Sequence, residues 1–171
     1  MAIRESILEF YRSPAKMTSP GAYAPEVVSL PRDVPTLARI AQGLLLHEHI
    51  APAYGVELAE RRRSETHTRT AEQILGLAYH HDGRPLADSR AVDDRVVGTC
   101  RNFTVLLVTL LRAQGAPARA RCGFRRLLRA GQVHRPLGGR NVGAAQKQLG
   151  PGRRSTGRCA AFAVQGRFRP A

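Results

Sequence analysis

Apolar residues recur three and four positions apart along most of the first half of this chain, which is the spacing of helices with one buried face. The spacing predicts a short amphipathic helix over residues 3–11, followed by a surface loop rich in Ser, Pro and Gly over residues 13–25. A longer helix is expected to begin after Asp33, whose side chain can cap it, and to continue through His49. The pattern therefore indicates a helical N-terminal half.

The next stretch carries shorter elements and more charge. We expect a short charged helix over residues 56–63, with residues 60–65 forming a solvated face. Thr70 can cap a helix that continues through His80 and turns three apolar side chains inward, those of Ile74, Leu75 and Leu77. A polar connection that contains proline, residues 83–94, leads to the following helix.

A cysteine stands where a loop is expected to become the most apolar helix of the chain. Gly98 and Thr99 come directly before Cys100, and Thr99 is a cap-type residue that can accept a bond from the free amides of the first turn. The helix is expected to end at Gly115, and residues 118–124 then alternate small or apolar side chains with arginine, which predicts a strand. The apolar face of the helix is formed by Phe103, Val105, Leu106, Leu107, Val108, Leu110 and Leu111.

The start of a helix is a position that favours the thiolate form of a cysteine. Free backbone amides and the positive end of the helix dipole stabilise the negative charge there. Free cysteines are also often buried, and many of them only fill space in a core. Helix position alone therefore does not separate a reactive Cys100 from a structural one.

The order of residues from 96 to 124 adds a second argument. A glycine, then Cys-Arg, a leucine-rich helix ending Leu-Leu-Arg-Ala-Gln-Gly, then Ala-Pro-Ala-Arg and a segment ending Gly-Phe resembles the transglutaminase-like family. The motif of that family runs roughly Gly-x-Cys-Arg, helix, Leu-Leu-Arg-x-x-Gly-Ile-Pro-Ala-Arg, strand, Gly-Phe. The resemblance implies a papain-like α+β fold, with Cys100 as an acyl-accepting nucleophile and a protein or peptide amide as the substrate. It implies neither a metal nor another cofactor.

In this family a histidine and an aspartate are expected on two later strands, in patterns like Asp-His-Trp-x-x-Glu and Trp-x-x-x-Asp. Neither pattern occurs in the chain, so we expect the sheet to be incomplete. The histidine that follows Cys100 in the sequence is His134, and it lies in a segment without strand periodicity. The resemblance therefore identifies Cys100 without identifying partners for it.

The charge of the chain is concentrated in its last segment. The net charge is +14, yet all 13 acidic residues lie at or before Asp94. Residues 125–171 contain 11 of the 27 Lys and Arg, so residues 1–124 hold 27 − 11 = 16 basic against 13 acidic residues. We therefore divide the chain into a nearly balanced domain, residues 1–124, and a basic segment, residues 125–171, whose composition predicts disorder.

Two explanations of the basic segment compete. A nucleic-acid-binding tail would account for the charge, although the segment lacks interleaved aromatic residues and a reading motif. A shifted reading frame after Phe124 accounts for the composition of the segment and also for the missing histidine and aspartate patterns. Codons for residues 134–142, taken one base later, permit Ile-Asp-His-Trp-Val-Ala-Glu-Met-Trp, and those for residues 149–153 permit Trp-Val-Leu-Val-Asp. One constant offset thus permits both missing blocks, in the family's order.

These observations predict a transglutaminase-like domain whose present chain is an inactive or truncated copy of a thiol acyltransferase or amidase. The alternative is a non-catalytic helical module with a basic nucleic-acid-binding tail. Three cysteines (Cys100, Cys122, Cys159) and the lack of a long apolar run favour a soluble cytoplasmic protein without a disulfide framework or a membrane partner. We assign the histidines at 47, 49, 80 and 81 to satisfied or solvated positions. On a helix, i and i+2 do not share a face, so His47 and His49 would not share a metal, and no Cys or His stands at ligand spacing nearby.

Overall fold

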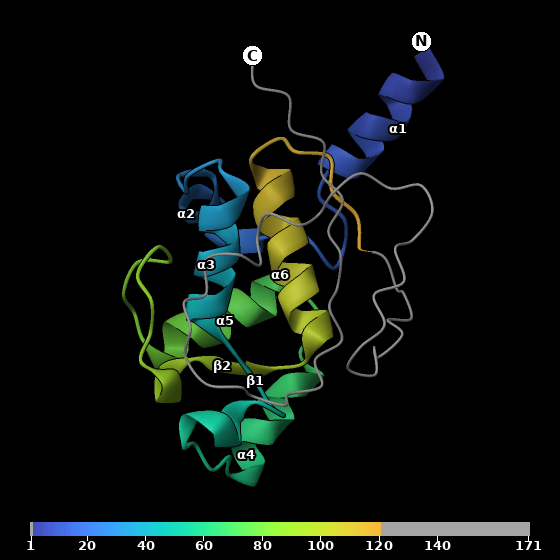
Figure 1. Cartoon of the computed structure of the whole chain (residues 1–171). Helices are drawn as coiled ribbons and strands as arrows, with labels where there is room; N and C mark the ends of the chain where they lie inside the picture. Colours follow the sequence, from blue (N-terminus) through green and yellow to red (C-terminus); the bar gives the residue numbers. More distant parts are fainter. Residues whose placement is uncertain (1, 121–171) are drawn as a thin grey trace, which may run out of the picture.

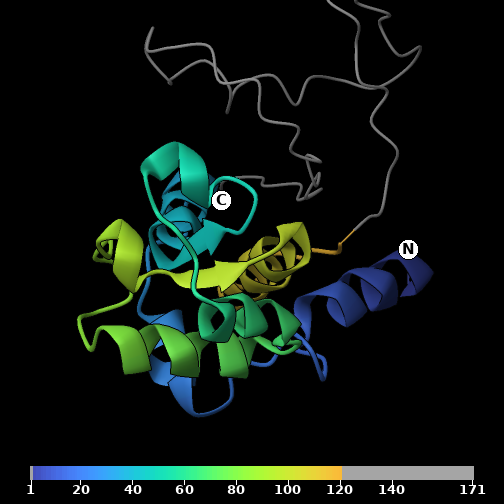
Figure 2. The same cartoon turned by 90° about the horizontal axis from the view of Figure 1, so that it is seen from below.

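The computed structural model describes residues 2–120 of the chain. Its centre is formed by α3 (Val34–Leu44), α5 (Ala71–His81) and α6 (Cys100–Ala113), whose apolar faces meet in one core. Two short strands pair at one end of these helices, and α1 (Ala2–Arg12) projects away from them in both views (Figures 1 and 2). The arrangement is helix-rich with a small sheet, which agrees with the predicted α+β class.

The N-terminal helix and the loop after it follow the sequence pattern closely. The predicted helix over residues 3–11 corresponds to α1. Its apolar face is open, since Ile3 is 78% and Phe10 is 71% exposed. The predicted loop ends earlier than expected, because a 3-10 turn at Gly21–Tyr23 and the helix α2 (Ala24–Val28) occupy its last part. Pro25 lies in the first turn of α2, where a missing amide is tolerated.

Helix α3 begins as predicted and ends earlier than predicted. Asp33 is its N-cap and accepts a hydrogen bond from the amide of Thr36 at 2.8 Å. The expected continuation through His49 is wrong, because Leu45 leaves the helical conformation and opens the strand β1 (Leu45–His47). Leu45 and Leu46 are both almost fully buried. Successive side chains of a strand point to opposite faces, and both leucines are buried here because both faces of β1 are covered.

The small sheet joins segments that are far apart in the sequence. Strand β1 pairs in parallel with β2 (Val96–Gly98), with Leu45 opposite Val96 and His47 opposite Gly98. Between them the chain passes through a 3-10 turn (Ala51–Tyr54), α4 (Glu60–Arg63), a second 3-10 turn (Ser64–His67) and α5. This connection brings the C-terminal end of α3 beside the residues that lead into α6.

Helix α5 confirms the prediction for residues 70–80. Thr70 caps it in a reciprocal arrangement with Gln73, and Ile74 and Leu75 are buried while Leu77 packs against the core. Helix α4 is shorter than expected, covering four residues. The polar connection between α5 and β2 contains one short 3-10 turn, Val92–Asp94.

The C-terminal end of α6 follows the predicted stop signal. Gly115 has a positive φ of 75° directly after the helix, a conformation that glycine adopts without steric cost. No strand is assigned to residues 118–120, and the rest of the strand expected over residues 118–124 lies outside the described residues. The basic segment, residues 125–171, lies outside them as well.

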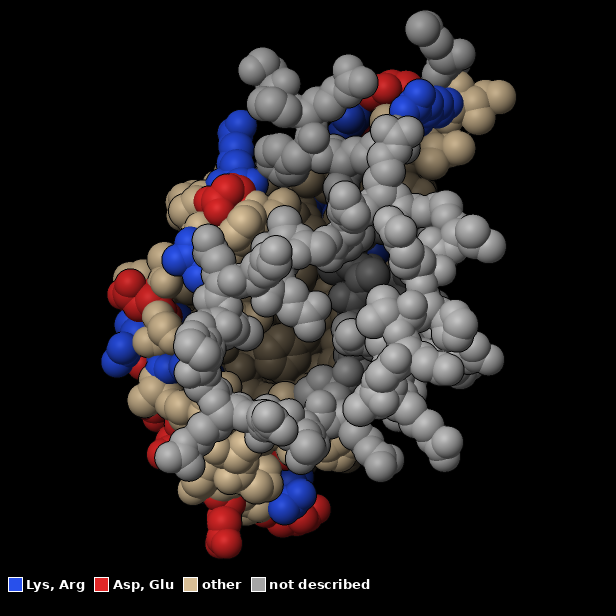
Figure 3. Space-filling view, in the orientation of Figure 1, with Lys and Arg blue, Asp and Glu red and all other residues tan. Residues whose placement is uncertain are grey.

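On the face shown in Figure 3, acidic and basic side chains alternate along the edge formed by described residues, without a large patch of one sign. Among the described residues, no helix has the combination of length and apolar character that crossing a membrane requires.

Candidate functional site

Cys100 is the first residue of α6 and follows directly on β2. Gly98 ends the strand, and Thr99 is an extended N-cap with φ −99° and ψ 173°. The thiol is free and half-buried. Within residues 2–120, no side chain forms a hydrogen bond with the sulfur. The site therefore presents a cysteine at a helix N-terminus, where free amides and the dipole favour the thiolate.

The first turn of α6 is capped from within. The side-chain oxygen of Asn102 accepts the amide N–H of Thr99 at 2.9 Å and its hydroxyl at 2.9 Å. Asn102 is buried, with 2% of its surface exposed. Thr99 occupies the predicted N-cap position, and Asn102 is a second capping residue that was not singled out from the sequence.

Gly98 lies where the first turn of α6 approaches β2 closely. A Cβ atom at this position would lie 3.0 Å from Cβ of Asn102 and 3.5 Å from a side-chain carbon of Leu45. The carbonyl of Gly98 accepts the amide of Glu48 at 3.0 Å. A larger residue would require the side chain of Asn102 to shift by a few tenths of an ångström, so the glycine two positions before Cys100 has a packing role here.

His47 reaches the same end of α6 from β1. It stands opposite Gly98 in the sheet, and its ring centroid lies 6.2 Å from that of Phe103, one turn after Cys100. Its Nδ1 accepts the amide of His49 at 3.2 Å, and the two rings are 5.5 Å apart. The prediction that His47 and His49 diverge on a helix is therefore wrong, because this segment is strand and turn.

The protonation of His47 is set by its surroundings. Burial, followed by the charge of His49, lowers its pKa from the ordinary value of 6.5, against a smaller opposing effect of Glu48. His47 is consequently neutral at pH 7. It borders an open hollow of about 670 Å³, whose wall also includes Phe103, Ile40 and Tyr54. Across residues 2–120, no three His, Cys, Asp or Glu side chains gather as metal ligands would.

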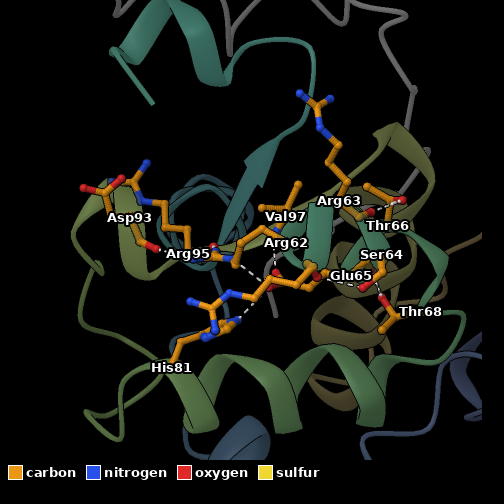
Figure 4. A network of polar contacts seen from close by, with 11 residues as sticks. Arg62, Arg63, Ser64, Glu65, Thr66, Thr68, His81, Asp93, Arg95 and Val97 are labelled. Carbon is orange, nitrogen blue, oxygen red and sulfur yellow. Dashed lines mark hydrogen bonds and ion pairs between the residues drawn. The ribbon is translucent and has the colours of Figure 1, made fainter. Parts of the chain in front are cut away.

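A buried carboxylate lies beside β2, where the sequence predicted a solvated face (Figure 4). Glu65 is 8% exposed, and this part of the prediction is wrong. One carboxylate oxygen lies 2.6 Å from Nε of Arg62 and 3.1 Å from Nε2 of His81, while the other accepts the amide of Val97 at 2.8 Å. Three polar partners from three parts of the chain offset the cost of burying this charge.

The same contacts place His81 among satisfied histidines, as predicted, although its partner was not identified. A signal for the ion pair was present, since Arg62 and Glu65 stand at i and i+3. Nothing in the local pattern shows that β2 and α5 will cover that pair. His134 and the other cysteines, Cys122 and Cys159, lie outside the described residues.

Comparison with known proteins gives one match. The sequence model of the transglutaminase-like superfamily matches residues 57–144, just over half of the chain. The matched range contains Glu65, β2 and Cys100, and it continues beyond Phe124. Neither a curated protein nor a solved structure matches the chain significantly.

Proposed function

Because this chain belongs to the transglutaminase-like superfamily, we propose that its ancestral chemistry is thiol acyl transfer and that Cys100 is the nucleophile. The observation that carries the assignment is the position of Cys100 within the matched range, as the first residue of α6. That position supplies free amides to the sulfur, and such microenvironments are where reactive cysteines are found.

In this chemistry the Cys100 thiolate attacks the carbonyl carbon of a protein or peptide amide. A sulfur–carbon bond forms, the carbon–nitrogen bond breaks, and the leaving amine takes a proton from a histidine that serves as general acid. The thioester then transfers its acyl group to water, which gives hydrolysis, or to an amine, which gives transamidation. An aspartate holds the imidazole of that histidine in the productive tautomer and orientation.

We propose further that the chain as written does not turn over an amide. The sequence after Cys100 contains His134 without a strand pattern around it and no acidic residue at all. His47 is close to the site, but its Nδ1 is occupied by the amide of His49, and no hydrogen bond links it to the sulfur. A one-base change of frame after Phe124 would permit histidine at position 136 and aspartate at position 153.

The nucleophile assignment is tested by alkylation of the full chain with iodoacetamide across a pH series, read peptide by peptide in a mass spectrometer. We expect Cys100 to react at neutral pH, and faster than Cys122. Cys100→Ser is the control for peptide identification. The assignment is wrong if Cys100 is inert under native conditions or if Cys122 reacts first.

A further inference from the structure

One short segment of the chain bonds to both sides of Cys100. Residues 62–68, here called the bracket segment, contain the end of α4 and the 3-10 turn Ser64–His67. The segment contacts the backbone that enters the site through β2 (Figure 4). It also contacts the side chains of the first turn of α6. It lies more than 30 residues away from Cys100 in the sequence.

On the upstream side, Arg62 and Glu65 hold alternate backbone groups of the incoming chain. The guanidinium of Arg62 donates to the carbonyl of Asp93 at 2.7 Å and to the carbonyl of Arg95. Glu65 accepts the amide of Val97 at 2.8 Å. Three backbone groups in five residues, ending three positions before Cys100, are thus bound by one ion pair.

On the downstream side, carbonyls of the bracket segment accept hydrogen bonds from the side chains of the two residues that follow Cys100. Arg101 donates to the carbonyls of Thr66 at 2.9 Å and Thr68 at 3.0 Å. Asn102 donates to the carbonyl of Thr68 at 3.0 Å and to its hydroxyl at 3.1 Å. The first turn of α6 is therefore attached to the same segment that holds β2.

Glu65 is the residue that holds the bracket segment in place. Its carboxylate is buried and joins Arg62 to His81 of α5, so it fixes the position of the segment relative to the core. The hydroxyl of Thr68 also donates to the backbone carbonyl of Glu65 at 2.8 Å. Removing the charge of Glu65 would release Arg62 from β2 and loosen Thr68 under α6 together.

We propose that Glu65 is a positioning residue for Cys100, acting through Arg62 and β2 on one side and through residues 66–68 on the other. The inference rests on the proposed function of Cys100 as nucleophile. Its physical basis is that the thiolate is stabilised by the amides of the first turn of α6 only while the sulfur and those amides keep a fixed geometry. A loosened turn lowers that stabilisation, and the sulfur then reacts more slowly near neutral pH.

The test uses the full chain and the pH profile of Cys100 alkylation. In Glu65→Gln, which keeps the size and an acceptor for Val97, we expect Cys100 to react about fivefold more slowly at pH 7, the order of a helix-terminus effect. The limiting rate at high pH should be unchanged, since the thiolate itself is still accessible. Glu60→Gln is the matched control, because it removes the same charge from an exposed position of α4, two residues before the segment.

A second pair of variants keeps the charge constant and guards against loss of folding. Arg62→Lys retains the positive charge but cannot reproduce the two-carbonyl fork, so it should shift the profile in the same direction. Arg61→Lys, at the exposed neighbouring position, should not shift it. Far-UV circular dichroism identifies a variant that has not folded. If Glu65→Gln does not fold, the comparison of Arg62→Lys with Arg61→Lys decides whether the positioning role holds.

The possible outcomes distinguish the positioning role of Glu65 from the proposed nucleophile role of Cys100. If wild-type Cys100 reacts no faster than Cys122 at pH 7, both are overturned, because no activated sulfur exists to be positioned. If wild-type Cys100 reacts faster than Cys122 while Glu65→Gln and Arg62→Lys match their controls, the positioning role is overturned and the nucleophile assignment stands. If the variants raise the alkylation rate of Cys100, Cys122 and Cys159 alike at every pH, Glu65 has only a general structural role and the inference fails.

Discussion

At the scale of single residues, burial sets the charge of His47. Burial lowers its pKa, so protonation is less favourable in the folded chain than in the unfolded one. Below the ordinary value of 6.5, the unfolded state therefore binds more protons at this position. The contribution of His47 to stability is complete above that value and is lost as the pH falls through the folded pKa.

This gives a prediction for the pH dependence of stability. The variant His47→Asn keeps an acceptor for the amide of His49 and removes the titrating group. The difference in unfolding free energy between the wild type and this variant should shift in favour of the variant as the pH falls from 7 to 5. Urea unfolding at several pH values measures it. A difference that is constant with pH would contradict the assigned shift.

Arg90 is a second residue whose properties are set by its surroundings, because its charged side chain is buried. Its guanidinium is 1% exposed, and burial lowers its pKa. It donates to four backbone carbonyls, those of Asp82, Arg84, Pro85 and Asp88, at 2.7–3.3 Å. These carbonyls belong to the connection between α5 and β2, which has little secondary structure of its own. Arg90 therefore organises this loop from the inside.

Replacing Arg90 by methionine should destabilise the chain by about 3 kcal/mol, because several buried carbonyls lose their donors at once. Arg69→Met, at an exposed position, should change stability by less than about 0.5 kcal/mol. Thermal or urea unfolding of the two variants gives the comparison. Equal effects of the two substitutions would contradict the structural role assigned to Arg90.

At the scale of elements, α6 is defined by its ends. Thr99 and Asn102 begin it. After it, the amide of Gly115 donates to the carbonyl of Arg112 at 2.9 Å and that of Ala116 to the carbonyl of Leu111 at 3.0 Å. Gly115 makes the second bond possible by its positive φ, and a Cβ there would meet no other atom within 4 Å. Any penalty for a side chain at 115 is therefore conformational rather than steric contact with the core.

Substitutions at two glycines distinguish the conformational penalty from steric contact. Gly115→Ala should cost about 1 kcal/mol, the penalty for placing a side chain in the left-handed region. Gly83→Ala has equally open surroundings without a positive φ, and it should be neutral or slightly stabilising, by up to about 0.5 kcal/mol. Unfolding free energies in urea test the pair. Equal costs for both substitutions would show that the C-terminal end of α6 is not held by this conformation.

At the scale of the whole molecule, the described residues expose apolar surface on α1. Ile3, Ile7 and Phe10 are 78%, 50% and 71% exposed along this helix. Exposed apolar faces of this kind favour association. The sequence also lacks the family's histidine and aspartate blocks. Without them, Cys100 has no partners for amide turnover.

We expect the 171-residue chain to be aggregation-prone and without amidase or transamidase activity. Restoring one frame after Phe124 should improve solubility and introduce amide turnover that Cys100→Ser abolishes. Size-exclusion chromatography and release of amine from a glutamine-containing peptide are the two measurements. Sequencing the gene around the codon of Phe124 is the control. An offset frame without histidine at position 136 or aspartate at position 153, or turnover by the chain as written, would contradict the proposal.

The sequence by itself determined the features that depend on neighbouring residues. The cap of α3 at Asp33, the cap of α5 at Thr70 and the stop at Gly115 are all local, because capping bonds and backbone preferences act within one helical turn. The family is also visible in the sequence, since its motif around Cys100 is contiguous. The cysteine half of the candidate site was predictable for the same reason.

Tertiary structure decided the features that depend on partners from distant segments. Residues 45–47 have the apolar spacing of a helix, and their pairing with β2 makes them a strand and turns His47 toward α6. Glu65 lies in a charged run typical of a solvated face, yet β2 and α5 cover it and leave it 8% exposed. Local periodicity carries no information about which segment will cover a residue. The burial of Glu65 and the attachment of one segment to both sides of Cys100 therefore follow only from the assembled fold.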